Sequence, residues 1–285
     1  MVGFHSETRN LCKLSPQSLD PHSNKNKIGT MIRPPISLHA LKAICRANGE
    51  GMVRDHEAVS FGVDFIDKKL GGGLARGGLH EIFAGQSDDG SVATAFAAML
   101  AERAVGDDQS ILWICEDRGL RQTGKIYAPG LRELGCDPAR LIMVTAADTL
   151  GLLRAGADSV KCAQLGAVIL EPWGKAPALD LTASRRLAMT AAASGVFVLV
   201  VRVEASPMPS AAHSRWQITA APSAALAANA PGHPAFDIKL LRHRGGIAGF
   251  ETGVEWNRDI RSFAPLSGGV PAYAASGADQ ARKAA

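Results

Sequence analysis

The fold is decided by the stretch Ser60–Ala104, which reads SFGVDFIDKKLGGGLARGGLHEIFAGQSDDGSVATAFAAMLAERA. Residues 61–67 predict a lead-in turn, a glycine-rich segment follows at 70–77, and Leu79–Gly85 predicts a short buried strand. A loop occupies Gly85–Val92, and apolar residues then recur at helical spacing, which predicts an amphipathic helix. A strand, a glycine loop and a helix in this order are typical of a phosphate-binding loop.

The order of these pieces resembles the RecA/RadA core, but the loop departs from its Walker A motif. Gly85 and Gly90 stand at the two glycine positions of G-x-x-x-x-G-K-[ST]. Ser91 stands where the lysine belongs, and Val92 stands where a hydroxyl should hold Mg²⁺. No Lys or Arg occurs within residues 77–102, so a shift of one residue does not recover the lysine. Because lysine and metal neutralise the charge that develops in phosphoryl transfer, we expect no ATPase activity, no metal and no cofactor.

Beyond the loop, apolar strands alternate with helices. Continuous apolar runs are typical of parallel strands covered on both faces, and strands joined by helices predict βαβ units. The sequence therefore predicts an α/β fold, a RecA-like core with a mostly parallel central sheet flanked by helices and a C-terminal β-hairpin. The predicted strands are Ser110–Cys115, Leu141–Val144, Ala167–Leu170, Val196–Val201 and Ser214–Ile218. One predicted helix lies within 126–135. A second follows the cap Asp148 and has Leu150 and Leu153 on its apolar face. A third spans Asp180–Ser194 and has Leu181 and Met189 on its apolar face.

Acidic residues follow two of these strands, at the edge where open α/β sheets place their ligands. The resemblance to RecA assigns Glu116, or Asp117 in the alternative register, to the position that activates the attacking water. It assigns Glu171 to the position that holds Mg²⁺. Because the lysine and the hydroxyl are missing, we interpret Glu116 and Glu171 as vestigial.

Composition and pattern divide the chain into five parts. Residues 1–33 predict a disordered N-terminal tail and residues 34–55 a short helix and linker. Residues 56–222 form the predicted core with its degenerate phosphate loop, and residues 235–258 a closing β-hairpin. Residues 264–285, rich in Gly, Ala and Pro, predict a disordered C-terminal tail.

Charge and composition bound the class of protein. The chain has 285 residues, a net charge of +4 and 46% hydrophobic residues, and no apolar run is long enough to cross a bilayer. We expect a cytoplasmic protein without membrane contact. The five cysteines form no C-x-x-C pair, and we interpret Cys115 and Cys162 as buried reduced thiols. The loop 204–213 lacks Lys and Arg, and we interpret it as a connector. The basic segment Arg242–Gly246 predicts a solvated hairpin end, with contact to nucleic acid or an acidic partner as the alternative.

Three groups of residues resemble the ImuA family more closely than they resemble the recombinases. The first is Phe61–Leu74 with Gly77–Ile82, in which Leu79-His80-Glu81 and the degraded loop are the specific marks. The second is the pair Arg215-Trp216, and the third is Leu241–Gly246. The resemblance covers residues 56 to about 258.

The resemblance implies an accessory protein in DNA repair and the SOS response to DNA damage. It would support mutagenic translesion synthesis beside an ImuB-like Y-family protein, RecA or both, while an error-prone replicative-type polymerase makes the DNA. Contact with DNA would then be indirect or weak. Two alternatives stay open: a divergent RecA-type DNA-dependent ATPase, and a SulA-like inhibitor of cell division.

Overall fold

A computed structural model of the chain describes residues 58–267. The predicted N-terminal tail at 1–33 and the short helix and linker at 34–55 lie outside the described residues, as does the part of the predicted C-terminal tail beyond residue 267.

The described residues form an α/β fold around one nine-stranded sheet of order β3-β2-β4-β5-β1-β6-β7-β8-β9. Strands from β3 to β6 in that order pair in parallel, and those from β6 to β9 pair antiparallel. This confirms the α/β class and the mostly parallel sheet. The strands are β1 (Leu79–Ala84), β2 (Ser110–Glu116), β3 (Leu141–Ala146), β4 (Leu165–Glu171), β5 (Phe197–Arg202), β6 (Ser214–Ala220), β7 (Ala235–His243), β8 (Glu251–Asn257) and β9 (Ser262–Pro265).

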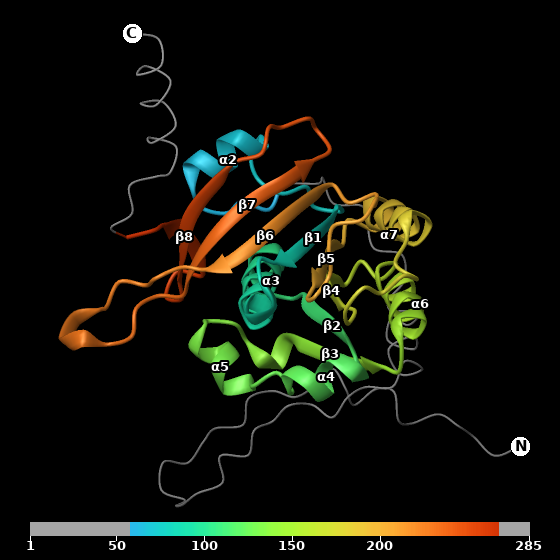
Figure 1. Cartoon of the computed structure of the whole chain (residues 1–285), viewed down its shortest axis with the longest axis horizontal. Coiled ribbons are helices and arrows are strands. Elements are labelled where there is room, and N and C mark those ends of the chain that lie inside the picture. The colour runs from blue at the N-terminus through green and yellow to red at the C-terminus, as the bar shows by residue number, and fades with distance from the viewer. Residues whose placement is uncertain (1–57, 268–285) are drawn as a thin grey trace, which may run out of the picture. The chain divides into compact units, whose positions relative to one another are not determined.

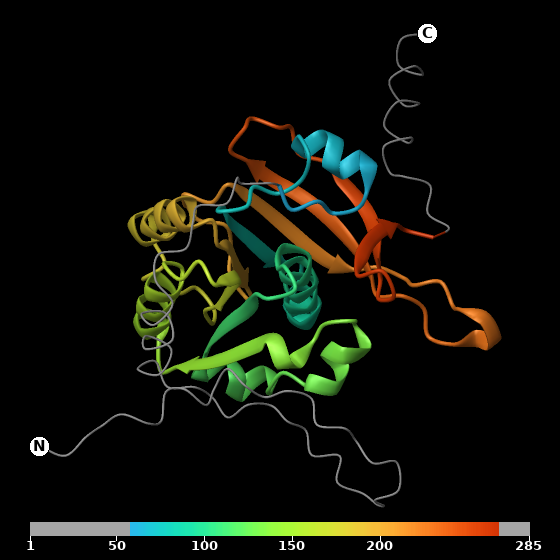
Figure 2. The ribbon, with the colours of Figure 1, turned by 180° about the vertical axis from the view of Figure 1, so that it is seen from behind.

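Helices flank the sheet on both faces (Figure 1). They are α2 (Asp64–Leu70), α3 (Gly90–Ala104), α4 (Asp117–Thr123), α5 (Ala128–Glu133), α6 (Thr149–Ser159) and α7 (Leu181–Ser194), with 3-10 turns η1 (Ser87–Asp89), η2 (Pro138–Arg140) and η3 (Ala227–Asn229). Helix α3 covers one face, and α6 and α7 lie side by side on the other, as the reverse view in Figure 2 also shows.

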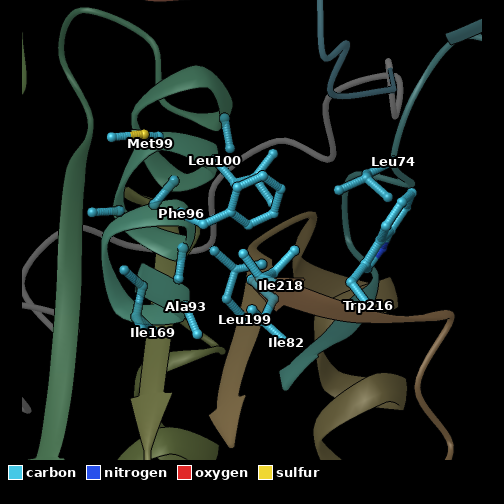
Figure 3. Packing of buried hydrophobic residues seen from close by; sticks show 14 of the residues in the cluster. Leu74, Ile82, Ala93, Phe96, Met99, Leu100, Ile169, Leu199, Trp216 and Ile218 are labelled. Atoms are coloured by element: carbon cyan, nitrogen blue, oxygen red, sulfur yellow. The ribbon is translucent and has the colours of Figure 1, made fainter. Parts of the chain in front are cut away.

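Two hydrophobic clusters match these two layers. On the α3 face, Phe96 and Met99 of α3 pack on Ile169, Leu199 and Ile218 of the sheet (Figure 3). A second cluster lies beneath α6 and α7. The strands between these layers are apolar on both faces because both faces are covered. Their continuous apolar runs therefore predicted β2, β4 and β5 correctly.

The lead-in segment contains a helix where the sequence predicted a turn. Asp67 of α2 holds the segment before it: its carboxylate accepts the Ser60 hydroxyl at 2.7 Å and the backbone N–H groups of Phe61 and Gly62 at 2.7 and 3.0 Å. Gly73 is required beyond α2, because its φ is +134° and a Cβ there would lie 2.3 Å from the carbonyl oxygen of Val59. These contacts set the path that leads the chain into β1.

The closing β-hairpin is present as β7 and β8, and the sheet continues further than predicted. β9 pairs antiparallel with β8, so Ala264 and Pro265, which the sequence assigned to a disordered tail, are part of a strand. Its Phe263 is 1% exposed and its ring packs near those of Phe61 and Trp256. The sequence missed β9 because it is four residues long and contributes a single large core side chain.

Candidate functional site: the degenerate phosphate loop and its pocket

The predicted phosphate loop joins β1 to α3. Its two glycines are explained by packing within the fold. A Cβ on Gly85 would lie 2.0 Å from Thr219 Cγ2 of β6, and a Cβ on Gly90 would lie 2.9 Å from Val203 Cγ1, just beyond β5. Both positions therefore need glycine for close approach, whether or not a phosphate binds.

The carboxylate of Asp89 lies inside this loop. Its Oδ2 accepts the backbone N–H of Gln86 at 3.0 Å, and its Oδ1 accepts the backbone N–H of Ala220, at the end of β6, at 3.1 Å. Asp89 is 9% exposed and directly precedes α3, whose N-terminal backbone dipoles favour negative charge. The loop thus places an anion of its own on backbone donors near the start of the helix.

The two residues that replace the lysine and the hydroxyl lie on the first turn of α3. Ser91 is exposed, and Val92 is half-buried against the core cluster on the α3 face. Neither side chain supplies a cation, and the Val92 side chain has no oxygen that could bind a metal. The loop offers backbone dipoles and no positive side chain.

Glu171, the last residue of β4, connects the sheet to α3. Its Oε1 accepts the Thr94 hydroxyl at 3.0 Å, its Oε2 accepts the indole N–H of Trp113 at 3.0 Å, and the Cys115 thiol donates to Oε2 at 3.5 Å. Burial and the neighbouring Glu171 raise the pKa of Cys115 well above its ordinary value. Glu171 therefore acts as an acceptor shared by β2 and α3, and the thiol stays protonated.

Glu116, the last residue of β2, is buried and ties two loops to the sheet. Its Oε2 accepts the Thr149 hydroxyl at 2.9 Å and the backbone N–H of Trp173 at 3.3 Å. Asp117, the residue assigned to this role in the alternative register, begins α4 and pairs with Arg121 on the exposed side of that helix. The buried carboxylate at this strand end is thus Glu116.

Gly90, Ser91, Glu116 and Glu171 line one pocket of about 370 Å³ between α3 and the α4–α5 segment. Its remaining wall is largely apolar. Side chains there include Trp113, Leu120, Ile126, Tyr127, Leu131 and Leu134. The structure therefore brings four of the six predicted loop and acidic residues together, while Gly85 and Val92 lie outside the lining.

Sequence reasoning missed two residues at the mouth of this pocket. Lys125 contributes an exposed amine, and Tyr127 is 70% exposed. Both lie in the short connection between α4 and α5, and the sequence placed Tyr127 in the predicted helix within 126–135 without a role at a site. Their separation from the phosphate loop by more than thirty residues in sequence gave no signal that they share its pocket.

The Leu79-His80-Glu81 motif and the Arg215-Trp216 pair meet on adjacent strands. β1 pairs with β6 so that His80 lies opposite Ser214 and Glu81 opposite Arg215. Arg215 Nε donates to Glu81 Oε2 at 2.6 Å, and its guanidinium also donates to Ser210 Oγ and to the Met208 carbonyl. Both charges are buried, so this ion pair fixes the loop 204–213 against the sheet.

His80 is fully buried in the same network. Its Nε2 lies 3.0 Å from the Ala75 carbonyl and its Nδ1 lies 2.7 Å from Ser214 Oγ, which also accepts the Trp216 indole N–H. A carbonyl only accepts, so Nε2 donates and Nδ1 accepts, which is the neutral tautomer. Burial lowers the pKa of His80 to about 3.

The basic end of the hairpin, Arg242–Gly246, is held partly by the loop 204–213. Arg242 donates to the carbonyls of Ser210 and Ala212 at 3.3 Å each, and the His243 ring packs edge-on against His213. Arg244 stays exposed. The loop 204–213 joins β5 to β6, and Arg242 donates hydrogen bonds to its backbone. Its interpretation as a connector stays a prediction.

The remaining predictions concern cysteines, metal and membrane. Cys115, Cys136 and Cys162 are buried free thiols, and burial raises the pKa of Cys136 to about 12. Across residues 58–267, no group of three or more His, Cys, Asp or Glu side chains is arranged to hold a metal ion. None of the helices in this part of the chain has both the length and the apolar composition needed to cross a bilayer.

No family model matches this chain. Comparison with curated proteins finds Protein ImuA of Caulobacter vibrioides (strain NA1000 / CB15N), which is 34% identical over 207 residues, covering 67% of this chain and 80% of that protein. Protein ImuA of Caulobacter vibrioides (strain ATCC 19089 / CIP 103742 / CB 15) shows the same identity and coverage. Identity at this level over most of the relative's length establishes common descent, and the chain belongs to the ImuA family.

Proposed function

We propose that the protein is a non-catalytic, RecA-like accessory protein in SOS-induced, error-prone translesion DNA synthesis. It works in the cytoplasm with an ImuB-like Y-family protein, RecA or both, while an error-prone replicative-type polymerase makes the DNA. Membership of the ImuA family supports the process. The strand, glycine loop and helix at β1–α3, with Glu116 and Glu171 at the ends of β2 and β4, support a RecA-like core.

The observation that carries the non-catalytic role is the position of Asp89. In a working phosphate loop, backbone N–H groups and a lysine surround the phosphates. Here the backbone N–H groups of Gln86 and Ala220 are bonded to the Asp89 carboxylate, and Ser91 takes the place of the lysine. A triphosphate bound at the N-terminus of α3 would lie close to the Asp89 carboxylate and be repelled by its charge, so we expect the loop to disfavour a triphosphate.

The test is ATP turnover by the purified full-length chain with Mg²⁺. We expect a rate equal to the background without protein, with and without single-stranded DNA. A matched variant, Asp89→Gly with Ser91→Lys and Val92→Thr, restores the missing groups and is expected to gain nucleotide binding. Magnesium-dependent turnover by the wild-type chain that Glu116→Gln abolishes would overturn the proposal.

A second candidate, a divergent RecA-type DNA-dependent ATPase, is favoured by one observation. Lys125 and Tyr127 share the pocket with Gly90 and Ser91, so a cation and an aromatic face lie near the loop. If this candidate is correct, turnover occurs and Lys125→Ala removes it. Nucleotide-dependent filaments on single-stranded DNA, seen by electron microscopy, would also support it.

Partners are tested by affinity capture with the tagged full-length chain from cells treated with a DNA-damaging agent. We expect recovery of the ImuB-like protein or RecA, identified by mass spectrometry. Recovery of the tubulin-like division protein alone, together with filamentous cells on overexpression, would support a SulA-like inhibitor instead.

A further inference from the structure

The pocket between α3 and the α4–α5 segment has the size of a ligand site, but the charges of its lining do not suit a phosphate. Its volume of about 370 Å³ lies within the range of roughly 300–1,000 Å³ that is usual for small-molecule pockets. Two carboxylates, Glu116 and Glu171, line it. Among the residues of 58–267 that line it, Lys125 is the only cation, and it is exposed. The charge of this lining favours a cation over an anion.

The two carboxylates receive hydrogen bonds only from neutral donors. Glu116 is 8% exposed, and its Oε2 accepts one hydroxyl and one backbone N–H, whereas no donor within residues 58–267 bonds to its Oε1. Glu171 is half-buried and accepts from a hydroxyl, an indole N–H and a thiol. In this part of the chain, no Lys, Arg or His lies within salt-bridge distance of either carboxylate. Because buried carboxylates usually have a cationic partner, the site lacks the charge that would compensate them.

The rest of the wall is apolar and aromatic, which favours an organic cation over a metal ion. Trp113, Leu120, Ile126 and Leu131 offer apolar surface, and Tyr127 adds an aromatic ring that is 70% exposed. Aromatic rings attract cations placed over their faces. Mg²⁺ and Ca²⁺ instead require several oxygen ligands, and no group of three or more His, Cys, Asp or Glu in residues 58–267 is arranged to hold a metal.

We propose that this pocket binds an organic cation, a guanidinium or ammonium group on an apolar stem. The charged head donates to Oε1 of Glu116 and is attracted by Glu171, and the stem lies against the apolar wall. The inference rests on the proposed non-catalytic role of the same pocket, since a nucleotide bound at the phosphate loop would compete for this space. The cation is a free small molecule or a Lys or Arg side chain of a protein; the chemistry is the same in both cases.

The test titrates the full-length chain with hexylguanidinium and with hexylurea, its neutral isostere, and follows binding by saturation-transfer NMR. We expect hexylurea to bind at least tenfold more weakly. Glu116→Gln should weaken hexylguanidinium at least tenfold and leave hexylurea within twofold, which also shows that the variant is folded. The matched control is Asp117→Asn, which removes the same charge from the neighbouring residue outside the lining. This control should leave both affinities within twofold of the wild type.

Two further arms of the experiment identify the source of the cation. A blocked peptide with a central arginine between two leucines that binds more tightly than hexylguanidinium would support the proposal with a protein side chain as the source. Weaker binding of the peptide would support it with a free small molecule. Tighter hexylguanidinium binding by a full-length variant whose Lys and Arg within residues 1–57 are changed to Gln would support it with the chain's own side chain as the source.

Equal affinity for hexylguanidinium and hexylurea overturns the proposal, as does the absence of binding by hexylguanidinium and by the arginine peptide to both full-length chains. Displacement of hexylguanidinium by Mg²⁺ at constant ionic strength would assign the two carboxylates to a metal and overturn it too. The proposed function fails separately: ATP turnover by a chain that still binds hexylguanidinium through Glu116 would overturn the non-catalytic role and support the cation site.

Discussion

Glu81 and Arg215 form a buried ion pair, in which the charge of each side chain is compensated by the other. Their side chains are 3% and 10% exposed and 2.6 Å apart. Arg202 lies near enough for Glu81 to act on it as well. Removing one partner of a buried pair leaves an uncompensated charge, which costs more than the pair itself contributes.

Glu81→Leu is therefore expected to lower the free energy of unfolding by about 3–5 kcal/mol. Urea unfolding followed by circular dichroism measures the change. The control is Lys239→Ala at the exposed pair Lys239–Glu251, where the expected change is about 0–1 kcal/mol. Equal losses in the two variants would contradict the assignment of Glu81 as the buried compensating charge.

His80 makes the stability of the fold depend on pH. Its pKa is lowered to about 3 in the folded protein, mainly by burial, against 6.5 ordinarily. Between these values the unfolded chain binds a proton that the folded chain does not, so stability is complete above about pH 6.5 and falls as the pH drops. The expected slope is about 1.4 kcal/mol per pH unit.

Urea unfolding at several pH values between about 7 and 5 checks this slope. The pKa values of His213 and His243 are lowered as well, so they add a dependence of the same sign. In His80→Gln the slope should shrink without vanishing. An unchanged slope in that variant would show that His80 does not titrate on unfolding.

Single-residue roles were predictable only where they depended on neighbours in sequence. The substitutions at Ser91 and Val92 were visible directly, as was the cap Asp148, which accepts the backbone N–H of Gly151. The role of Asp89 was not predictable, because its partner Ala220 lies 131 residues away. Lys125 and Tyr127 were missed for the same reason.

Elements were predictable where burial left a strong pattern. The core strands show continuous apolar runs because helices cover both faces of the sheet. Helices α2 and α4 have seven residues each and were missed, since short helices owe their stability to packing rather than to their own sequence. β9 was missed because it has four residues and contributes one large buried side chain, Phe263.

β9 is nonetheless expected to be essential to the core. Phe263 packs near the rings of Phe61, Phe96, Phe236 and Trp256. Phe263→Ala should lower the free energy of unfolding by about 3–5 kcal/mol. Thermal and urea unfolding measure the loss. Ile260→Ala, at a position 68% exposed just before the strand, is the control and should change stability by about 0.5 kcal/mol or less.

Taken as a whole, the molecule presents two unrelated surfaces on opposite faces of one sheet. The phosphate-loop pocket lies beside α3, and a second pocket, lined by Leu150, Arg154 and Arg186 among others, lies between α6 and α7 on the other face of the sheet. No residue lines both pockets. This arrangement suits a protein whose proposed role is to contact partners.

The stability of the whole molecule should also be insensitive to nucleotide. A ligand that binds the folded state raises the unfolding temperature by mass action. Under the proposal that Asp89 and Ser91 disfavour a triphosphate, ATP with Mg²⁺ is expected to leave the thermal midpoint of the wild-type chain unchanged in scanning fluorimetry. The variant Asp89→Gly with Ser91→Lys and Val92→Thr should instead show a rise in its midpoint on addition of ATP. A rise in the wild type would count against the role assigned to Asp89.

The Asp89 carboxylate is covalently attached to the loop whose Gln86 N–H it accepts, and it also accepts the N–H of Ala220. A tethered group meets its binding site at an effective concentration of roughly millimolar or more, and this value does not change with metabolism. Under the proposed function, a free phosphate would have to compete with that fixed local supply for the N–H groups of Gln86 and Ala220. These two hydrogen bonds are encoded in the chain itself, so they do not vary with the nucleotide supply of the cell.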